Sequence, residues 1–210
     1  MQSRRGAAKV GTAPPVRNFG RNIEVCPRHL YRPAGEIALL EILEAHRSGK
    51  IRAVGSGHAW SPGIACEDVL LDMSSFNHIE LVQRAEGPEV RAGGGATVKD
   101  ILRFLTPRGM TLPSIGLIAE QTIAGATATG THGSGRHSLS HYVTEVRVAC
   151  FGGEGGSPEM RCIRHGQALR AARCALGCLG VVTEVSVRCV PQYDLEEQSQ
   201  WAESLEQVLA

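Results

Sequence analysis

Aromatic side chains are scarce in this chain, making up only 4% of its 210 residues. The core must therefore be built from Val, Ile, Leu and Ala, around the many turns that 25 glycines allow. This composition suits a β-rich, ligand-binding globular domain. The length is sufficient for one large domain or two small lobes.

An excess of charge is also missing, because 22 basic and 21 acidic residues leave a net charge of +1. Binding to nucleic acid needs a concentrated basic face that neutralises phosphates, so we expect no nucleic-acid partner. Basic residues do gather around Pro14 and Pro15. We expect residues 1–20 to form a basic, disordered tail, with a transit peptide or a basic tether as alternatives.

Long apolar runs are absent as well. No run approaches the roughly 18 residues of a membrane span, and the N-terminus lacks the apolar stretch of a signal peptide, so we expect a soluble, cytoplasmic protein. The seven cysteines are scattered and include no C-x-x-C pair. They predict reduced, buried thiols rather than a disulfide framework or a zinc site, and the histidines show no metal-ligand spacing.

Small residues, by contrast, fill residues 122–135, which read Thr-Ile-Ala-Gly-Ala-Thr-Ala-Thr-Gly-Thr-His-Gly-Ser-Gly. The glycines permit close approach of the backbone to a ligand, and the hydroxyls and amides can bind an anion. A flexible linker is the alternative, but linkers are polar throughout, whereas this stretch contains Ile123 and three alanines. We therefore predict a ligand-binding loop.

Hydrophobic periodicity divides the chain into two lobes and an acidic end. Residues 21–88 are predicted to form a first lobe, with a helix at 36–48 and strands at 51–54, 69–73 and 79–83. Residues 89–193 are predicted to form a second lobe, with strands at 89–92, 142–151, 160–163 and 181–190, a helix capped by Thr97 and a helix at 167–174. Residues 194–210 are acidic and polar around Trp201 and are predicted to begin a further helix. Helices and antiparallel strands in this order indicate an α+β fold.

Two familiar phosphate-binding motifs nearly match, and both fail. The dinucleotide fingerprint begins at Gly55, but Trp60 stands where its third glycine belongs. The mononucleotide loop matches the spacing of Gly125 and Gly130, but the lysine that must follow is missing. We therefore expect the ligand in small-residue loops outside both of these folds.

Five short motifs carry a more specific signal: Gly55-Ser-Gly-His58, Leu112-Pro-Ser-Ile-Gly116, Thr122-Ile-Ala-Gly125, Ala128-Thr-Gly-Thr-His-Gly133 and Leu179-Gly-Val-Val-Thr-Glu-Val185. In this order and spacing, over about residues 16–191, they resemble the FAD-binding domain of the vanillyl-alcohol oxidase superfamily. Within it they are most similar to the aldonolactone oxidases, the group of gulonolactone, arabinonolactone and alditol oxidases. One departure is Ala59, because serine commonly follows the histidine in this family.

The resemblance implies an α+β, two-lobed, PCMH-type FAD-binding domain, with a small parallel sheet in one lobe and a larger antiparallel sheet with helices in the other. It also implies that His58 is the point of covalent attachment to FAD. For His132, fixing the loop by a hydrogen bond is as good an expectation as contact with the cofactor. The implied cofactor-binding residues are Gly55, Ser56, Gly57, His58, Ala59, Gly116, Thr122, Gly125, Thr129, Gly130, Thr131, His132, Gly133 and Val182.

The implied activity is that of an FAD-dependent oxidoreductase that oxidises a CH–OH group of a sugar-1,4-lactone or polyol, with O2 as the acceptor. No catalytic residue is assignable in this chain, because members of the family carry their substrate-facing groups in a second domain. The resemblance implies that residues 194–210 are the start of a truncated substrate domain. Two alternatives remain open: a non-catalytic flavin-binding module, and another member of the superfamily such as a relative of the UDP-N-acetylmuramate reductases.

Overall fold

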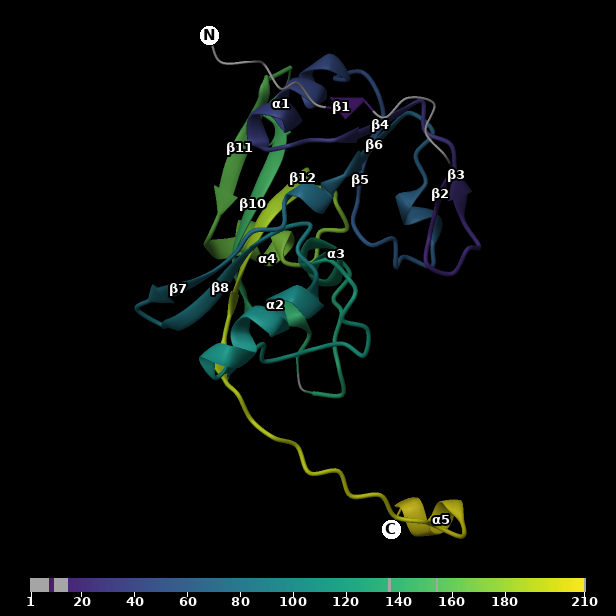
Figure 1. Ribbon diagram of the computed structural model, residues 1–210, viewed down its shortest axis with the longest axis vertical. Helices are drawn as coiled ribbons and strands as arrows, with labels where there is room; N and C mark the ends of the chain where they lie inside the picture. The colour runs from purple at the N-terminus through teal and green to yellow at the C-terminus, as the bar shows by residue number, and fades with distance from the viewer. Residues whose placement is uncertain (1–7, 10–14, 136, 154, 210) are drawn as a thin grey trace.

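Two β-sheets organise the protein, as Figure 1 shows for the computed structural model, which describes residues 8–9, 15–135, 137–153 and 155–209. One sheet has four strands in the order β1-β4-β6-β5, and the other has five in the order β11-β10-β12-β8-β7. The predicted α+β fold, with a small parallel sheet and a larger antiparallel sheet, is confirmed.

The smaller sheet is built around β6 (Val69–Asp72), which pairs in parallel with both β4 (His29–Arg32) and β5 (Ile51–Val54). The short β1 (Ala8–Lys9) adds an antiparallel edge. Helix α1 (Glu36–Ala45) crosses from β4 to β5 and buries Leu39, Ile42 and Leu43, the stripe that their spacing predicted.

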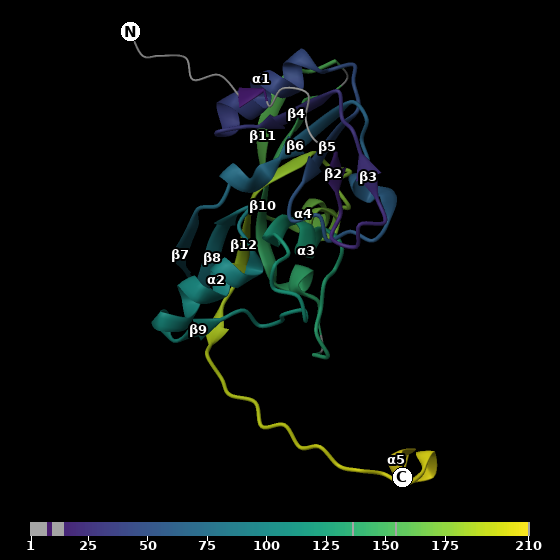
Figure 2. The ribbon, with the colours of Figure 1, turned by 45° about the vertical axis from the view of Figure 1, so that its right-hand side comes forward.

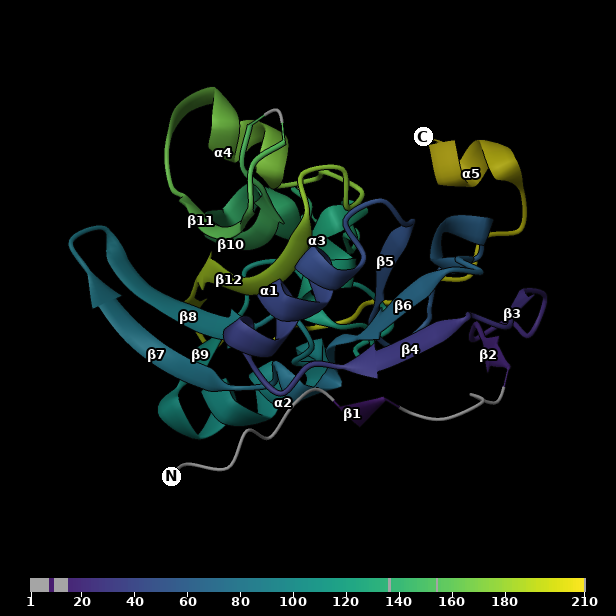
Figure 3. The ribbon, with the colours of Figure 1, turned by 90° about the horizontal axis from the view of Figure 1, so that it is seen from above.

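The larger sheet is antiparallel throughout. Its edge hairpin of β7 and β8 projects from the body in Figure 3. The strands expected at 142–151 and 181–190 are present, each within two residues of its expected ends. The five strands are β7 (Ile79–Arg84), β8 (Gly87–Gly93), β10 (Val143–Phe151), β11 (Pro158–Ile163) and β12 (Val181–Arg188).

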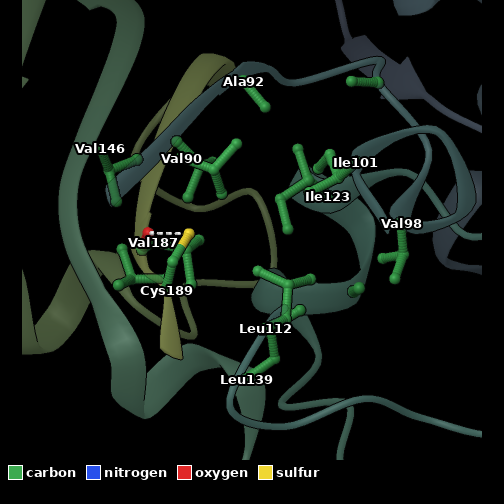
Figure 4. Packing of buried hydrophobic residues seen from close by; sticks show 14 of the residues in the cluster. Val90, Ala92, Val98, Ile101, Leu112, Ile123, Leu139, Val146, Val187 and Cys189 are labelled. Carbon is green, nitrogen blue, oxygen red and sulfur yellow. Dashed lines mark hydrogen bonds between the residues drawn. The ribbon is translucent and has the colours of Figure 1, made fainter. Parts of the chain in front are cut away.

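Helices α2 (Val98–Leu105), α3 (Ile123–Ala128) and α4 (Gly166–Ala172) bury apolar side chains against this sheet. Figure 4 shows Val90 of β8 facing Ile101 and Ile123 from the helices, and all three side chains are fully buried. Each such burial contributes about 1.5–3 kcal/mol to stability. A second cluster joins α1 to both sheets.

The remaining elements are short. Strand β2 (Val16–Arg17) pairs with β3 (Glu24–Val25), and β9 (Met110–Thr111) pairs with β13 (Val190–Pro191). Single 3-10 turns cover residues 62–64, 73–75, 106–108 and 139–142. Residues 192–204 then leave the body and end in α5 (Leu205–Leu209), as Figures 1 and 2 both show.

The structure corrects the sheet to which one predicted strand belongs. The strand at 79–83 was expected in the first lobe, but β7 pairs with β8 in the antiparallel sheet, from Ile79 opposite Ala92 to Arg84 opposite Gly87. The reason is the tight turn between the two strands, which makes them hairpin partners. The start of a substrate domain at residues 194–210 stays a prediction.

Residues 15–20 are also not the loose tail expected for residues 1–20. Asn18 is only 3% exposed, and its side chain donates to Ala59 O at 2.9 Å and accepts from the Ile23 N–H at 3.0 Å. Arg17 forms an ion pair with Glu24 on the paired strand. The rest of the predicted tail, apart from β1, lies outside the described residues.

The cysteines are free, as predicted, but the expectation that they are buried is wrong for most of them. Only Cys66 and Cys189 are buried, and Cys150 is half-buried. The exposed cysteines lie in loops, in turns and at a sheet edge, where the sequence pattern does not show whether a side chain is buried. They are Cys26, Cys162, Cys174 and Cys178. Within the described part of the chain, no helix is long and apolar enough to cross a membrane.

Candidate functional site

The loop after β5 contacts the start of α3. A Cβ placed on Gly55 would lie 2.2 Å from Thr122 Oγ1 and 2.7 Å from its Cγ2. Contacts this short are not tolerated, so only glycine allows the two segments to approach this closely. The structure thus brings together Gly55 and Thr122, two of the predicted site residues that are far apart in sequence.

A second pair of segments meets in the same way. A Cβ on Gly116 would lie 2.6 Å from Thr131 Cγ2, and one on Gly133 would lie 2.5 Å from Ile115 O. Residues 115–116 therefore run directly against residues 131–133. This contact links the predicted motif that ends at Gly116 with the predicted motif that ends at Gly133.

The first half of the small-residue stretch is a helix, so the prediction of a loop over residues 122–135 is wrong there. Thr122 caps α3, accepting from the Gly125 N–H at 3.4 Å, and Ile123 and Ala126 point into the core. Threonine at an N-cap and repeated alanine favour helix, and this local preference prevails over the glycine. Gly125 and Thr129 lie on the exposed side, where Thr129 Oγ1 donates to Gly125 O at 3.1 Å.

Gly130 ends this helix. Its φ of +67° is left-handed, its N–H donates to Thr127 O at 3.2 Å, and the Thr131 N–H donates to Ala126 O at 2.9 Å. These two bonds form a Schellman motif, in which glycine is preferred because a Cβ disfavours the left-handed conformation. The resemblance to a mononucleotide-binding loop in this stretch therefore arises from a helix end.

The chain after the helix is held partly by His132. Its Nδ1 donates to Gly133 O at 2.7 Å while the residue stays exposed. This bond is the loop-fixing role that the sequence allowed for His132. Contact of the same ring with the cofactor stays a prediction.

The His58 ring packs against the N-terminal segment. Phe19 stacks on it with ring centroids 4.7 Å apart and planes 20° apart. The Phe19 N–H donates to Gly57 O at 2.8 Å, and Gly57 has a φ of +69°. His58 Nδ1 is buried, and among the described residues it has no hydrogen-bond partner. Sequence reasoning missed Phe19 because this segment carried only the signal of a basic tail.

Glu120 is a further group near His58 that sequence reasoning missed. Its pKa is lowered by a hydrogen bond from its own backbone, by Lys99, whose Nζ lies 3.3 Å from Glu120 Oε1, and to a smaller extent by the charge of His58. The imidazole therefore lies within electrostatic range of a carboxylate. No residue pattern marked Glu120, because it stands between the motifs.

Val182 lies on the other side of α3. A Cβ on Gly94 would lie 2.5 Å from Val182 O, so β12 and the turn after β8 are in close contact. A cavity of about 10 Å³, lined by Ala124, Ala128 and Val182 among others, lies between one part of α3 and the sheet. It has room for about one water molecule, so it is not itself a dinucleotide pocket.

A larger open groove, of about 480 Å³, lies on α2 and contains none of the predicted site residues. Its lining includes Leu102, Arg103 and Pro107. In the described part of the chain, no three His, Cys, Asp or Glu side chains gather in a way that could hold a metal ion.

The structure thus brings small-residue segments into contact in pairs, and in the described part of the chain the buried Nδ1 of His58 has no hydrogen-bond partner. The FAD binding domain family matches residues 27–155, more than half of the chain. The chain belongs to this family, and the PCMH-type FAD-binding domain that the motifs predicted is confirmed, with FAD as its cofactor.

Curated relatives agree with this assignment. The chain is 44% identical over 181 residues to a long-chain alcohol oxidase of an uncultured marine euryarchaeote, a match that covers 86% of this chain and 38% of that protein. It is 35% identical over 183 residues to an L-gulono-1,4-lactone dehydrogenase of Mycobacterium tuberculosis, which covers 84% and 41%. The chain thus spans about two fifths of the length of these relatives.

A solved structure shows the same fold. Cholesterol oxidase from Brevibacterium sterolicum superposes with a TM-score of 0.79 at 21% identity, over 88% of this chain and 38% of that chain.

The residues present fit FAD. His58 Nδ1 is a buried polar atom that lacks a partner among the described residues, and a bound ligand can supply one. The exposed side of α3 carries only Gly125 and Thr129, so no large side chain obstructs a flat ring or a phosphate there. The chemistry that FAD supplies when bound is the acceptance of one hydride, which carries two electrons.

Proposed function

We propose that this chain is the FAD-binding part of an oxidoreductase that acts on a CH–OH group. The observation that carries the proposal is that the long-chain alcohol oxidase at 44% identity and the lactone dehydrogenase at 35% differ in substrate but are both named for oxidising a hydroxyl-bearing compound. These relatives share with this chain the part that binds FAD. The match therefore supports oxidation of a CH–OH group more strongly than it supports either substrate.

The proposed cofactor contacts follow the segments that meet. Residues 55–59, with Gly57 turning the backbone, would surround the pyrophosphate and the flavin edge from one side. Gly116 would lie near the ring, and the backbone of Val182 would bond the nucleotide. The other side would be lined by Thr122, Gly125, Thr129, Gly130, Thr131, His132 and Gly133. Backbone amides and hydroxyls in such segments satisfy phosphate oxygens.

His58 is the proposed point of covalent attachment. A ring nitrogen would bond to the 8α-methyl carbon, with loss of one proton from each partner, and the two electrons released would pass through the flavin to O2. The chain's contribution is position, because the imidazole is fixed between its loop and Phe19.

Purified protein tests the attachment. We expect the yellow colour to stay with the protein after acid precipitation and a tryptic peptide containing His58 to carry the mass of FAD. His58→Ala should still bind FAD and release it on denaturation. Complete release from the wild-type protein would show that His58 is not the attachment point.

Two substrate classes are candidates. A sugar-1,4-lactone or polyol, with O2 as acceptor, follows from the sequence motifs and from the relatives named for lactones. A long-chain alcohol is favoured by the higher identity, 44% against 35%. Anaerobic bleaching of bound flavin by each substrate separates them when measured on a protein that carries this chain together with its substrate domain.

The 210-residue chain alone is expected to be a flavoprotein with little or no turnover of either substrate. The proton of the hydroxyl must pass to a base, a transfer worth roughly 10² to 10⁴-fold, and no such base is assignable in this chain. Brisk lactone oxidation by the purified chain would contradict this expectation. Binding of FAD without reduction by any substrate, even with a second domain present, would favour the non-catalytic module. Reduction by NADPH instead would favour a relative of the UDP-N-acetylmuramate reductases.

A further inference from the structure

We propose that Phe19 is a positioning residue for His58, supplied by an N-terminal segment that lies outside the residues matched by the family, 27–155. The inference rests on the proposed function, in which His58 faces the flavin. It assigns a role to residues 16–20, which the sequence alone presents as part of a tail.

The first observation is the ring stack. Centroids 4.7 Å apart and planes 20° apart place the Phe19 ring nearly parallel to the imidazole. Aromatic rings in an offset stack resist tilting, because tilting loses both contact area and the favourable quadrupole geometry. Since both ring nitrogens lie in the imidazole plane, the stack restricts the directions in which they point.

The second observation is that the backbone on both sides of His58 is tied to the same segment. The Phe19 N–H donates to Gly57 O at 2.8 Å, and Asn18 Nδ2 donates to Ala59 O at 2.9 Å. The residues immediately before and after His58 are therefore both bonded to residues 18–19. His58 is thus restrained through the backbone of its two neighbours as well as through its ring.

The third observation concerns what Phe19 does not do. It is 55% exposed and belongs to none of the hydrophobic clusters among the described residues, so it contributes little to the core. Besides His58, the only aromatic ring that it contacts within the described part of the chain is that of Trp60, in a T-shaped arrangement with centroids 5.8 Å apart. Contact with His58 therefore accounts for the position of this large, exposed ring.

The fourth observation is the unpaired nitrogen. His58 Nδ1 is buried and has no hydrogen-bond partner in the described chain, so no hydrogen bond at this atom fixes the orientation of the ring. The stack with Phe19 is then the main restraint on the imidazole side chain. Loss of the stack should free the ring to rotate, and misplacement of a reacting group by about 1 Å can cost roughly 10²-fold in rate.

The test compares Phe19→Leu, which keeps an apolar side chain but lacks a ring face, with Phe19→Tyr, which keeps the ring. Apoprotein is mixed with FAD, and the fraction of flavin that stays with the chain after acid denaturation is followed over time. We expect attachment to slow by roughly 10- to 100-fold in Phe19→Leu and to remain near the wild-type rate in Phe19→Tyr. Ile37→Ala is the control, because Ile37 is also a large exposed apolar residue, 77% exposed, and belongs to none of the hydrophobic clusters among the described residues.

A second readout requires no flavin. The ¹³C relaxation of the His58 ring should report a rigid side chain in the wild-type apoprotein and a more mobile one in Phe19→Leu, while the thermal midpoint stays within a few degrees. Equal attachment rates and equal ring mobility in the wild type and Phe19→Leu would overturn the proposal.

The two ideas fail differently. If the wild-type protein releases all its flavin, the covalent attachment is wrong, but the comparison of ring mobility still decides whether Phe19 positions the ring. If His58→Ala abolishes attachment and Phe19→Leu does not change it, His58 keeps its role and Phe19 loses the one proposed here.

Discussion

Gly130 shows how a single backbone angle shapes the candidate site. Its φ of +67° closes the Schellman motif at the end of α3 and sends the chain toward His132 and Gly133. The nearest atom to a Cβ at this position, Cys174 Sγ, would be 3.6 Å away, so space is available and only the angle forbids a side chain.

Gly130→Val should therefore destabilise the protein by about 1–3 kcal/mol and lower the amount of FAD bound, because a β-branched residue is strained in the left-handed region. Urea unfolding and the flavin-to-protein ratio measure the two effects. Gly135→Ala is the control, since Gly135 lacks a left-handed angle and a Cβ there would meet nothing within 4 Å. Equal flavin content in folded Gly130→Val would remove this turn from the site.

Gly116 has a structural role that must be separated from its proposed role beside the flavin. The resemblance implies a place near the flavin ring, and we predict that a side chain there would hinder the approach of O2. The structure shows that a Cβ on Gly116 also collides with Thr131 Cγ2, at 2.6 Å. Gly116→Ala alone would therefore disturb both the packing against Thr131 and any path for O2. Thr131→Ser removes the methyl group with which the new Cβ collides, and so separates the two effects.

We expect Gly116→Ala to lower the thermal midpoint and Gly116→Ala/Thr131→Ser to restore most of it. If Gly116 leaves a path for O2, the double variant should still reoxidise dithionite-reduced flavin more slowly than Thr131→Ser alone. Stopped-flow mixing with aerated buffer measures this rate. Identical rates in these two variants would contradict the gate.

At the scale of elements, the antiparallel sheet carries charged side chains on the face away from α2 and α3. Glu145 of β10 is 6% exposed and accepts from Cys162 Sγ of β11 at 2.9 Å and from Nε of Arg164, the residue after β11, at 2.8 Å. Burial alone would raise the pKa of Glu145, but the hydrogen bonds and the charge of Arg164 outweigh it, and the pKa is lowered.

The sign of this shift predicts a pH dependence. A carboxylate whose pKa is lower in the folded state stabilises the protein above its unfolded pKa, ordinarily 4.5, and loses this contribution as the pH falls through the folded value. The wild-type protein should lose stability relative to Glu145→Gln as the pH drops below about 4.5. Thermal midpoints from pH 7 to pH 3 test this, and parallel curves would contradict it.

The neighbouring thiol gives an independent readout of the same network. Burial, together with the hydrogen bond to Glu145 and the charge of Glu145, raises the pKa of Cys162. Glu145→Gln removes the negative charge, so the pKa of Cys162 should fall and its alkylation by iodoacetamide should accelerate, because the thiolate is the nucleophile. Cys178, exposed in a distant turn, serves as the internal control. A slower or unchanged rate at Cys162 would argue against the bond to Glu145.

At the scale of the whole molecule, the C-terminal segment leaves the body (Figure 1) and keeps its large apolar side chains exposed. Leu195, Trp201 and Leu209 are 85%, 93% and 77% exposed, and α5 buries no residue. Gln192, just before this segment, is still bonded to the body, because its N–H donates to Gly109 O at 2.9 Å.

Deletion of residues 194–210 should therefore leave the thermal midpoint and FAD binding of the chain unchanged, because no buried contact is lost. It should also reduce self-association, since large exposed apolar side chains promote it. Differential scanning calorimetry and light scattering measure the two. A drop of several degrees in the midpoint would show that the segment docks on the body.

The sequence by itself determined those features that depend on neighbours along the chain. The spacing of Leu39, Ile42 and Leu43 defines α1, and Thr97 caps α2 by accepting from the Asp100 N–H at 3.0 Å, because helix faces and caps are local. The order of five small-residue motifs was enough to identify the family. Alternation of buried residues likewise predicted the long strands β10 and β12.

Only the tertiary structure decided what meets across long separations. The bond between Asn18 and Ala59 joins residues 41 positions apart, and Phe19 stacks on His58 beside it, yet nothing in the residues around Phe19 marks a partner. The pairing of β7 with the larger sheet was likewise invisible, because alternation defines a strand but does not name its neighbour. Local chemistry selects elements, whereas the partners of exposed rings and edge strands are selected by the packing of the whole chain.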